Sequence, residues 1–459
     1  MPQEDKTQQK PKKHRDWTKG SLLRNLLLLS WPMVTMELLW AFSQVWDMIW
    51  IGRVGSAAIA GVGIANVVIM LVMSVDMGVL MGARAVIARC IGAKDQAGAN
   101  HAAGQTIIIG SCWGLLLTAI FVPLAENVIG IFSSSPEVIA QGTLYMRTLF
   151  VGWISMEVLV MCLYTTQSAG DTMTPLIVEI IIRAVHLTLC PFLVLGLWIF
   201  PQLGVAGAAI SNIISQVLGA VILLTILLKG RTRLHLAPHD FKPVASSIWR
   251  ILRIGIPALI MNLQKSAGDL ILLRIITPFG TLAIAAHSVV SRVELFLTGI
   301  PLGLGAGSGV LIGQNLGAEQ PKRAEKTGWQ AIAVVEVFMA LCCIALVIWA
   351  EPIIGIFTSE PELVQVGSLF LRIATLGYLM LALVNVLQFA IAGAGDTLPT
   401  MIFSIVMLWI VQIPLAIFLP DLTGTGVYGV RWALVGGSTA GAVIYIIYFM
   451  MGRWKKKRV

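Results

Sequence analysis

Charged residues are scarce in this chain. Asp, Glu, Lys and Arg together make up 12% of its 459 residues, about half the share that soluble domains carry. A soluble chain of this length would form about three domains with charged surfaces, and the composition excludes that class. Hydrophobic residues make up 57% instead, in run after run longer than the roughly 20 residues that cross a bilayer. The chain is therefore predicted to be a polytopic membrane protein.

The sequence also lacks the motifs of an enzyme. It contains no Walker lysine motif, so nothing points to ATP hydrolysis, and no nucleophile–base or metal-ligand set stands out. We therefore expect no enzymatic activity, no metal and no cofactor other than a coupling ion, H⁺ or Na⁺. The cysteines have no metal-ligand spacing and are interpreted as small packing residues. They lie in or beside apolar runs, at Cys90, Cys112, Cys162, Cys190, Cys342 and Cys343.

The net charge of +9 is unevenly placed. Of the 32 Lys and Arg residues, 24 fall in five short stretches on alternate sides of the apolar runs, whereas the loops 125–142 and 351–366 contain Glu but neither Lys nor Arg. This positive-inside pattern predicts a plasma membrane protein, in a bacterial or archaeal inner membrane, with both termini cytoplasmic. The basic tail is expected to contact anionic membrane lipids, and the placement argues against nucleic acid as a partner. Residues 1–16 are predicted to form a disordered lead-in.

Blocks of the sequence recur 225 residues later. Trp31-Pro32 corresponds to Ile256-Pro257, and Ala169-Gly170-Asp171-Thr172 corresponds to Ala394-Gly395-Asp396-Thr397. Two copies of one membrane unit are typical of secondary transporters. Because each copy holds an even number of spans, an axis along the membrane normal must relate the copies, rather than an inverted repeat.

The predicted fold is all-α, with twelve transmembrane helices in two six-helix lobes related by a pseudo-two-fold axis. The expected organisation is an N-terminal segment at 1–20, an N-lobe at 21–228, a cytoplasmic linker at 229–248, a C-lobe at 249–451 and a basic tail at 452–459. The spans are expected at 21–51, 57–83, 99–124, 143–166, 175–199, 205–228, 249–276, 282–312, 327–350, 366–391, 399–419 and 427–451.

Several motifs on this repeat resemble those of the multidrug and toxic compound extrusion (MATE) family, over about residues 20–450. They are Pro32, the stretch Trp46-Asp47-Met48-Ile49-Trp50-Ile51-Gly52 with Gly55, the stretch Ala285-Ala286-His287-Ser288 with Arg292-Val293-Glu294, the stretch Gly313-Gln314-Asn315-Leu316-Gly317-Ala318, and the paired Ala-Gly-Asp-Thr turns. The resemblance implies a two-lobe antiporter that expels organic cations in exchange for H⁺ or Na⁺. It is closer to the DinF-like branch of the family than to the NorM-like branch.

Asp47 is the best candidate for ion coupling, because an ionisable residue in hydrocarbon is costly and is usually functional. It matches the membrane aspartate of the family's first span. The DinF-like branch adds an Asn and an Asp in span 5, and here His186 and Cys190 take those positions; Asn212 falls where the family often has a Thr. This set of groups favours H⁺ over Na⁺. A static role for Asp47, or for His186 as a packed polar residue, remains the alternative.

The cation site of the NorM-like branch looks absent from the second half. Lys265 and Leu381 occupy the positions of its two acids. Lys265 and Asp269 are four residues apart on one helix and are predicted to form an intramembrane ion pair. Such a pair has either a structural role or the role of a functional switch.

Other residues are candidates for a central substrate cavity. Glu37 and Asp76 are acids within spans, and Trp40, Met73 and Met77 are their aromatic and Met neighbours. Such a lining suits flat lipophilic cations, although a Met stripe is more often ordinary packing. Glu157 is a further acid in a span with no assigned role, whereas Glu294 with Arg292, and Glu336, are candidates for polar contacts between the lobes.

We therefore expect a proton-coupled multidrug antiporter that works by alternating access as a monomer, with lipophilic cationic small molecules as substrates. One alternative within transport is a flippase for lipid-linked precursors, although such proteins commonly have more than twelve spans. Another is a membrane receptor or scaffold without transport, which the buried acids and the duplicated lobes disfavour.

Overall fold

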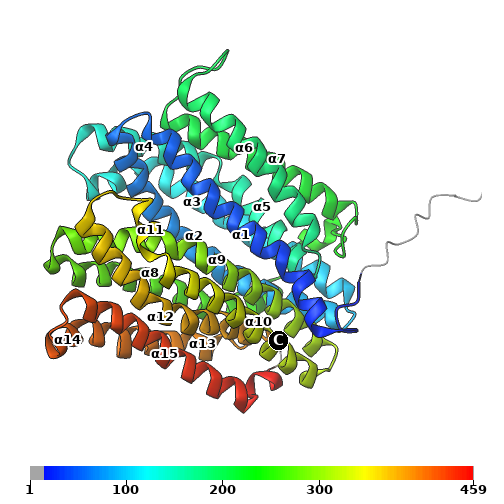
Figure 1. Ribbon diagram of the computed structural model, residues 1–459. Coiled ribbons are helices and arrows are strands. Elements are labelled where there is room, and N and C mark those ends of the chain that lie inside the picture. The colour runs from blue at the N-terminus through cyan, green and yellow to red at the C-terminus, as the bar shows by residue number, and fades with distance from the viewer. Residues whose placement is uncertain (1–14, 458) are drawn as a thin grey trace, which may run out of the picture.

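The computed structural model describes residues 15–457 and 459, and within them the regular structure is helical throughout (Figure 1). Most of the predicted segment 1–20, including its disordered lead-in, lies outside the described residues. The first lobe contains α1 (Leu22–Gly52), α2 (Ser56–Gly92), α3 (Gln96–Phe132), α4 (Pro136–Val151), α5 (Trp153–Ser168), α6 (Met173–Leu195) and α7 (Val205–Leu228). The second contains α8 (Ala245–Ile276), α9 (Thr281–Gly317), α10 (Pro321–Ile348), α11 (Ala350–Gly355), α12 (Pro361–Gly393), α13 (Thr397–Ile405), α14 (Ile413–Thr423) and α15 (Val427–Met451).

These helices account for the twelve expected spans. Ten helical segments of the described chain are long and apolar enough to cross a membrane, counting α13 to α14 as one span interrupted by a π-helical turn at Val406–Gln412. The pair α4 and α5, bent by 55° at Gly152, forms an eleventh. Helix α8 carries more charge than a typical span, and we assign it as the twelfth because it is the repeat counterpart of α1.

The repeat is also visible in side-chain contacts. In the first lobe, the Arg147 guanidinium donates to the Val122 carbonyl at 3.1 Å and lies 3.5 Å from a Glu126 carboxylate oxygen. In the second, the Arg372 guanidinium donates to the Val347 carbonyl at 3.4 Å and lies 3.1 Å from a carboxylate oxygen of Glu351. All three positions are offset by 225 residues. The two lobes are therefore copies in space as well as in sequence.

The lobes touch closely at the end where α1 and α8 begin and where α2 and α9 end. Glycines allow this approach, because a side chain would collide with the backbone or side chain of the opposite lobe. A Cβ at Gly82 of α2 would lie 2.2 Å from the Ile251 carbonyl oxygen of α8, and a Cβ at Gly307 of α9 would lie 2.1 Å from the Ser30 hydroxyl oxygen. We call this set of contacts the interlobe seal.

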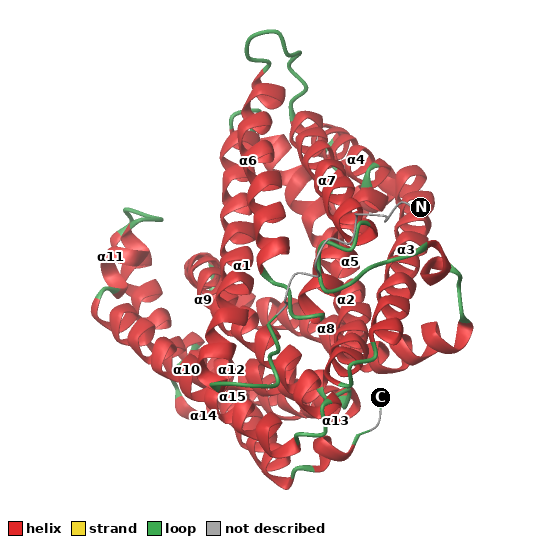
Figure 2. Ribbon diagram, turned by 90° about the vertical axis from the view of Figure 1, so that its right-hand side faces the viewer, coloured by secondary structure: helices red, strands yellow, loops and turns green. Residues whose placement is uncertain are grey.

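The described glycines at the other end make no such contact between the lobes. Gly55 and Gly63 of the first lobe, and Gly280 of the second, have no atom within 4 Å of a Cβ placed on them. Figure 2 shows the backbones of the lobes diverging toward the end that carries α11. The structure is thus closed at the end of the termini and open at the opposite end.

The terminal segments add contacts at the closed end. The Arg89 guanidinium of α2 donates to the Lys457 carbonyl at 2.8 Å, and Lys457 lies 3.2 Å from the Asp396 carboxylate. Trp454 is fully buried, with its ring stacked on that of Phe449. The tail is thus anchored to the protein through its tryptophan and through Lys455 and Lys457, which lie 2.7 and 3.2 Å from the Glu325 and Asp396 carboxylates. Arg453 and Lys456 are exposed, and contact of the basic tail with lipid headgroups stays a prediction.

Candidate functional site

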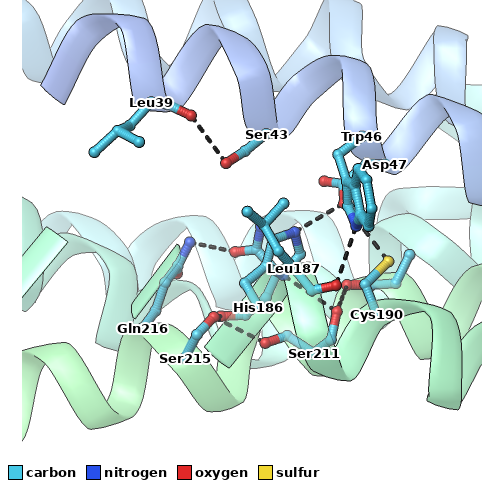
Figure 3. A network of polar contacts seen from close by, with 12 residues as sticks. Leu39, Ser43, Trp46, Asp47, His186, Leu187, Cys190, Ser211, Ser215 and Gln216 are labelled. Atoms are coloured by element: carbon cyan, nitrogen blue, oxygen red, sulfur yellow. Dashed lines mark hydrogen bonds and ion pairs between the residues drawn. The ribbon is translucent and has the colours of Figure 1, made fainter. Parts of the chain in front are cut away.

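Asp47 of α1 faces α6 across a short polar contact (Figure 3). Its Oδ1 atom lies 2.8 Å from Nε2 of His186 and 3.6 Å from Sγ of Cys190. His186 and Cys190 reach the same oxygen because they are one helical turn apart on α6. The indole N–H of Trp46 donates to the Leu187 carbonyl at 3.1 Å and fixes α1 against α6. The structure therefore brings together three of the four residues predicted for the coupling site.

The second nitrogen of the imidazole also has a partner. Nδ1 of His186 lies 3.2 Å from the hydroxyl of Ser211 on α7, and this hydroxyl also lies 2.9 Å from the Ala208 carbonyl. A neutral imidazole can donate from Nε2 to Asp47 and accept at Nδ1 from Ser211. An imidazolium can donate at both nitrogens, with the serine O–H turned to Ala208. One hydroxyl rotation thus accommodates either protonation state of a histidine that is 1% exposed.

Asn212 does not join this network. Its side-chain oxygen accepts a hydrogen bond from Gln216, one turn further along α7. Successive helical residues point about 100° apart, so only one of two neighbours can face His186, and that one is Ser211. The structure therefore adds Ser211 to this network, one residue before the predicted Asn212. The sequence offered no signal to choose between the two, because both are polar residues in an apolar span.

Replacing Ser211 by Ala should lower transport about tenfold and shift its pH dependence. The change leaves one ring nitrogen of a buried histidine without a partner, at a cost of about 1–3 kcal/mol. Asn212→Ala is the matched control and should change the rate less than about twofold, since its side chain bonds only Gln216 among the described residues. The measurement is the initial rate of cation efflux from proteoliposomes over a range of pH. A larger effect of Asn212→Ala would contradict this assignment.

The predicted cavity residues do not all face one cavity. Glu37 is half-buried at the boundary between the lobes. A Cβ placed on Gly299 of α9 would lie 3.4 Å from the Cβ atom of Glu37. Trp40 and Met73 are half-buried, and Met77 packs on the core of the first lobe.

Asp76 is 5% exposed and lies against Glu157 inside the first lobe. The structure thus places Asp76 in the interior of the first lobe, and its role in a substrate cavity stays a prediction. Asp76 points from α2 toward α5. Its contact with Glu157 joins residues that are far apart in the sequence, so a local pattern could not predict it.

The ion pair predicted between Lys265 and Asp269 is absent. Both side chains are exposed on α8, and no contact of 4.0 Å or less joins them in the described part of the chain. Helical spacing allows such a pair to form, but the exposed side chains have other conformations open to them. The second lobe instead holds a buried arginine, Arg431 of α15. Its guanidinium lies 3.6 Å from the Glu294 carboxylate, which also accepts a hydrogen bond from Tyr378 at 2.9 Å.

Removing Arg431 should destabilise the protein. The side chain is 1% exposed and lies over the Phe370 ring at 4.8 Å. Arg431→Leu leaves Glu294 without its cation, at an expected cost of about 3–5 kcal/mol, whereas the double variant Arg431→Leu/Glu294→Leu should recover most of that loss. Thermal unfolding of the purified protein measures both. Equal losses in the single and double variants would show that the pair does not act as a unit.

Comparison with known proteins agrees with this architecture. The MatE family profile matches residues 32–192 and again 257–418, so each match begins at one of the paired prolines. The chain belongs to the MATE family. Its relationship to the DinF-like branch remains a prediction.

Among curated MATE relatives, the chain is 27% identical to a probable multidrug resistance protein NorM of Thermotoga maritima, over 95% of this chain and 94% of that protein. It is 24% identical to a FAD transporter of Shewanella oneidensis, over 86% of this chain and 87% of the other. Among solved structures, an outward-facing multidrug resistance MATE transporter superposes with a TM-score of 0.90 at 21% identity, covering 96% of this chain and 98% of that one. The twelve-helix, two-lobe fold of a multi-pass membrane transporter is thus confirmed.

Proposed function

We propose that this chain is a secondary active antiporter that exports lipophilic organic cations in exchange for H⁺. The observation that carries the proposal is the network of Asp47, His186 and Ser211, in which a half-buried carboxylate and a buried imidazole share a hydrogen bond of 2.8 Å inside a membrane lobe. Family membership and relatives named for multidrug resistance support the class of substrate.

The partners of Asp47 favour a proton over Na⁺ as the coupling ion. Its Oδ1 atom meets a ring nitrogen and a thiol, whereas hard cations require several oxygen ligands. The donor set thus suits exchange of a proton between a carboxylate and an imidazole.

The position of Asp47 suits alternating access. It lies near the end of α1 that faces the open side, and 17% of its side chain is exposed. With both termini cytoplasmic, the open side is external, so external protons reach the site while the interlobe seal blocks the cytoplasm. Proton and cation then drive transport by preferring different lobe arrangements. The protein acts as a monomer in this scheme, because one chain with its two lobes contains the complete site.

The test is efflux from proteoliposomes of the purified chain, with pH and Na⁺ gradients imposed separately. Ethidium is the cationic probe, and FAD is a second arm because one relative carries that name. Ethidium export driven by the pH gradient alone is the expected result. Export driven only by Na⁺ would overturn the coupling ion, export of FAD but not ethidium would overturn the substrate class, and export of neither would overturn the proposal.

A further inference from the structure

A second pair of ionisable groups lies inside the first lobe, apart from the Asp47 network. Asp76 of α2 and Glu157 of α5 are neighbours in the interior of the lobe and are 5% and 1% exposed. Trp153, one turn before Glu157, donates its indole N–H to the Oε1 atom of that acid at 2.8 Å. Helix α3 packs directly against Glu157 at Gly114, where a Cβ would lie 2.9 Å from the Glu157 Cγ atom.

Two carboxylate oxygens in this pair have no donor. Oδ1 of Asp76 and Oε2 of Glu157 are buried and receive no hydrogen bond from any described residue. An unpaired buried carboxylate is strongly destabilised, and two adjacent ones repel each other as well. One proton on either oxygen supplies the missing donor and removes one of the two charges. The indole N–H of Trp113 on α3, which is also buried without an acceptor, lies beside Asp76 as well. A proton shared by the two acids supplies the donor that the facing oxygens lack.

No cation performs this task instead. The arginine of α2 nearest in sequence, Arg84, lies between the rings of Tyr164 and Phe389, at 5.6 and 5.3 Å from their centroids. No other ionisable group on the surrounding helices forms an ion pair with Asp76 or Glu157 within the described chain. Those groups are Glu37 and Asp47 on α1, Arg89 and Cys90 on α2, His101, Cys112 and Glu126 on α3, Glu137, Tyr145 and Arg147 on α4, Cys162 and Tyr164 on α5, Glu179, Arg183, His186 and Cys190 on α6, Arg250, Arg253, Lys265, Asp269 and Arg274 on α8, His287, Arg292 and Glu294 on α9, and Glu362, Arg372 and Tyr378 on α12, while α7 has none.

The pair is not needed to build the lobe. The repeat counterparts of Asp76 and Glu157 in the second lobe are Pro301 and Ala382, and the corresponding helices α9 and α12 form and pack without any acid there. Two carboxyl groups in hydrocarbon are costly. Their presence in one copy only indicates a role beyond folding.

We propose that Asp76 and Glu157 form a second proton-binding site of this transporter, which holds one shared proton in the arrangement with the interlobe seal closed. Loss of that proton leaves two negative charges in contact and pushes α2 away from α5. Gly78 lies two residues beyond Asp76, about 200° around the helix, and faces the other lobe. A Cβ there would lie 2.7 Å from the Leu259 Cβ atom of α8. Protonation of the pair is thereby linked to the interlobe seal.

Difference infrared spectroscopy of the purified full chain in lipid nanodiscs tests this site without measuring transport. A protonated carboxyl group gives a carbonyl-stretch band that shifts in heavy water and disappears on deprotonation. We expect such a band near neutral pH in the wild type, and its loss in Glu157→Gln and in Asp76→Asn. Asp47→Asn is the control and should retain it, so that failure of the proposed coupling at Asp47 and failure of this site are told apart.

A wild-type chain without the band, or a band that both pair variants retain, would overturn the proposal. So would loss of the band on adding Na⁺ at constant pH, because the site would then bind a metal cation. If the variants do not fold, a wild type without the band still overturns the proposal, and the tryptophan signal is the second readout. Trp153 donates to Glu157, so its fluorescence should change with pH in step with the infrared band, and Trp153→Phe should remove that change.

Discussion

Asp47→Asn is expected to abolish cation export driven by a pH gradient while leaving substrate binding within about threefold of the wild type. A gradient of one pH unit stores about 1.4 kcal/mol per proton, enough to support about a tenfold concentration ratio of the exported cation. Asparagine preserves the size of the side chain and its capacity to accept from His186, but it does not bind a proton. The concentration ratio should therefore fall to unity, whatever the size of the imposed gradient.

The measurement is the steady-state ratio of ethidium across proteoliposome membranes as the pH gradient is increased, with binding measured separately by fluorescence polarisation. Asp269→Asn is the matched control, because it removes a carboxylate from α8 in the other lobe that makes no ion pair among the described residues. It should keep the wild-type ratio. An Asp47→Asn protein that still concentrates ethidium would exclude the coupling role of this carboxylate.

The overall fold was predictable because its determinants are local or periodic. Span length, the placement of Lys and Arg, and the offset of 225 residues are properties of the sequence itself, and they led to twelve helices in two lobes. Part of the site was predictable for the same reason. His186 and Cys190 share a helix face through their spacing, and the family resemblance placed Asp47 opposite them.

The remaining polar contacts depend on helix rotation and on partners that are distant in sequence. Ser211, rather than Asn212, faces His186 because of a rotation of about 100°, which hydrophobic patterning does not resolve in a span that is apolar all round. Asp76 meets Glu157, and Glu294 meets Arg431, across separate helices. Each of these residues is a costly polar group whose partner is fixed only by tertiary packing.

Gly82→Val should hold the transporter with its interlobe seal open and stop the transport cycle. The added Cβ would lie 2.2 Å from the Ile251 carbonyl oxygen, and backbone atoms cannot rotate away as a side chain can. Overpacking of this kind costs about 1–3 kcal/mol at least, which lowers the population of the sealed state about 5- to 150-fold. Ethidium export should fall by a similar factor, while the Asp47 network, which lies nearer the open end, stays intact.

Spin labels at Ser134 and Ser359 measure how far apart the two lobes are at the open end, because these exposed residues are repeat partners. The exposed Cys112 is replaced by Ser in this chain so that it is not labelled. The separation of the two labels should shorten in Gly82→Val, because lobes that cannot meet at one end rock together at the other. Gly63→Val is the matched control on the same helix, since no atom lies within 4 Å of a Cβ there. An unchanged separation in Gly82→Val, together with normal export, would mean that the seal tolerates a side chain and does not control access. Equal effects of both variants would instead mean that a β-branched residue within α2 causes the loss by itself, because Gly82 faces the opposite lobe and Gly63 does not.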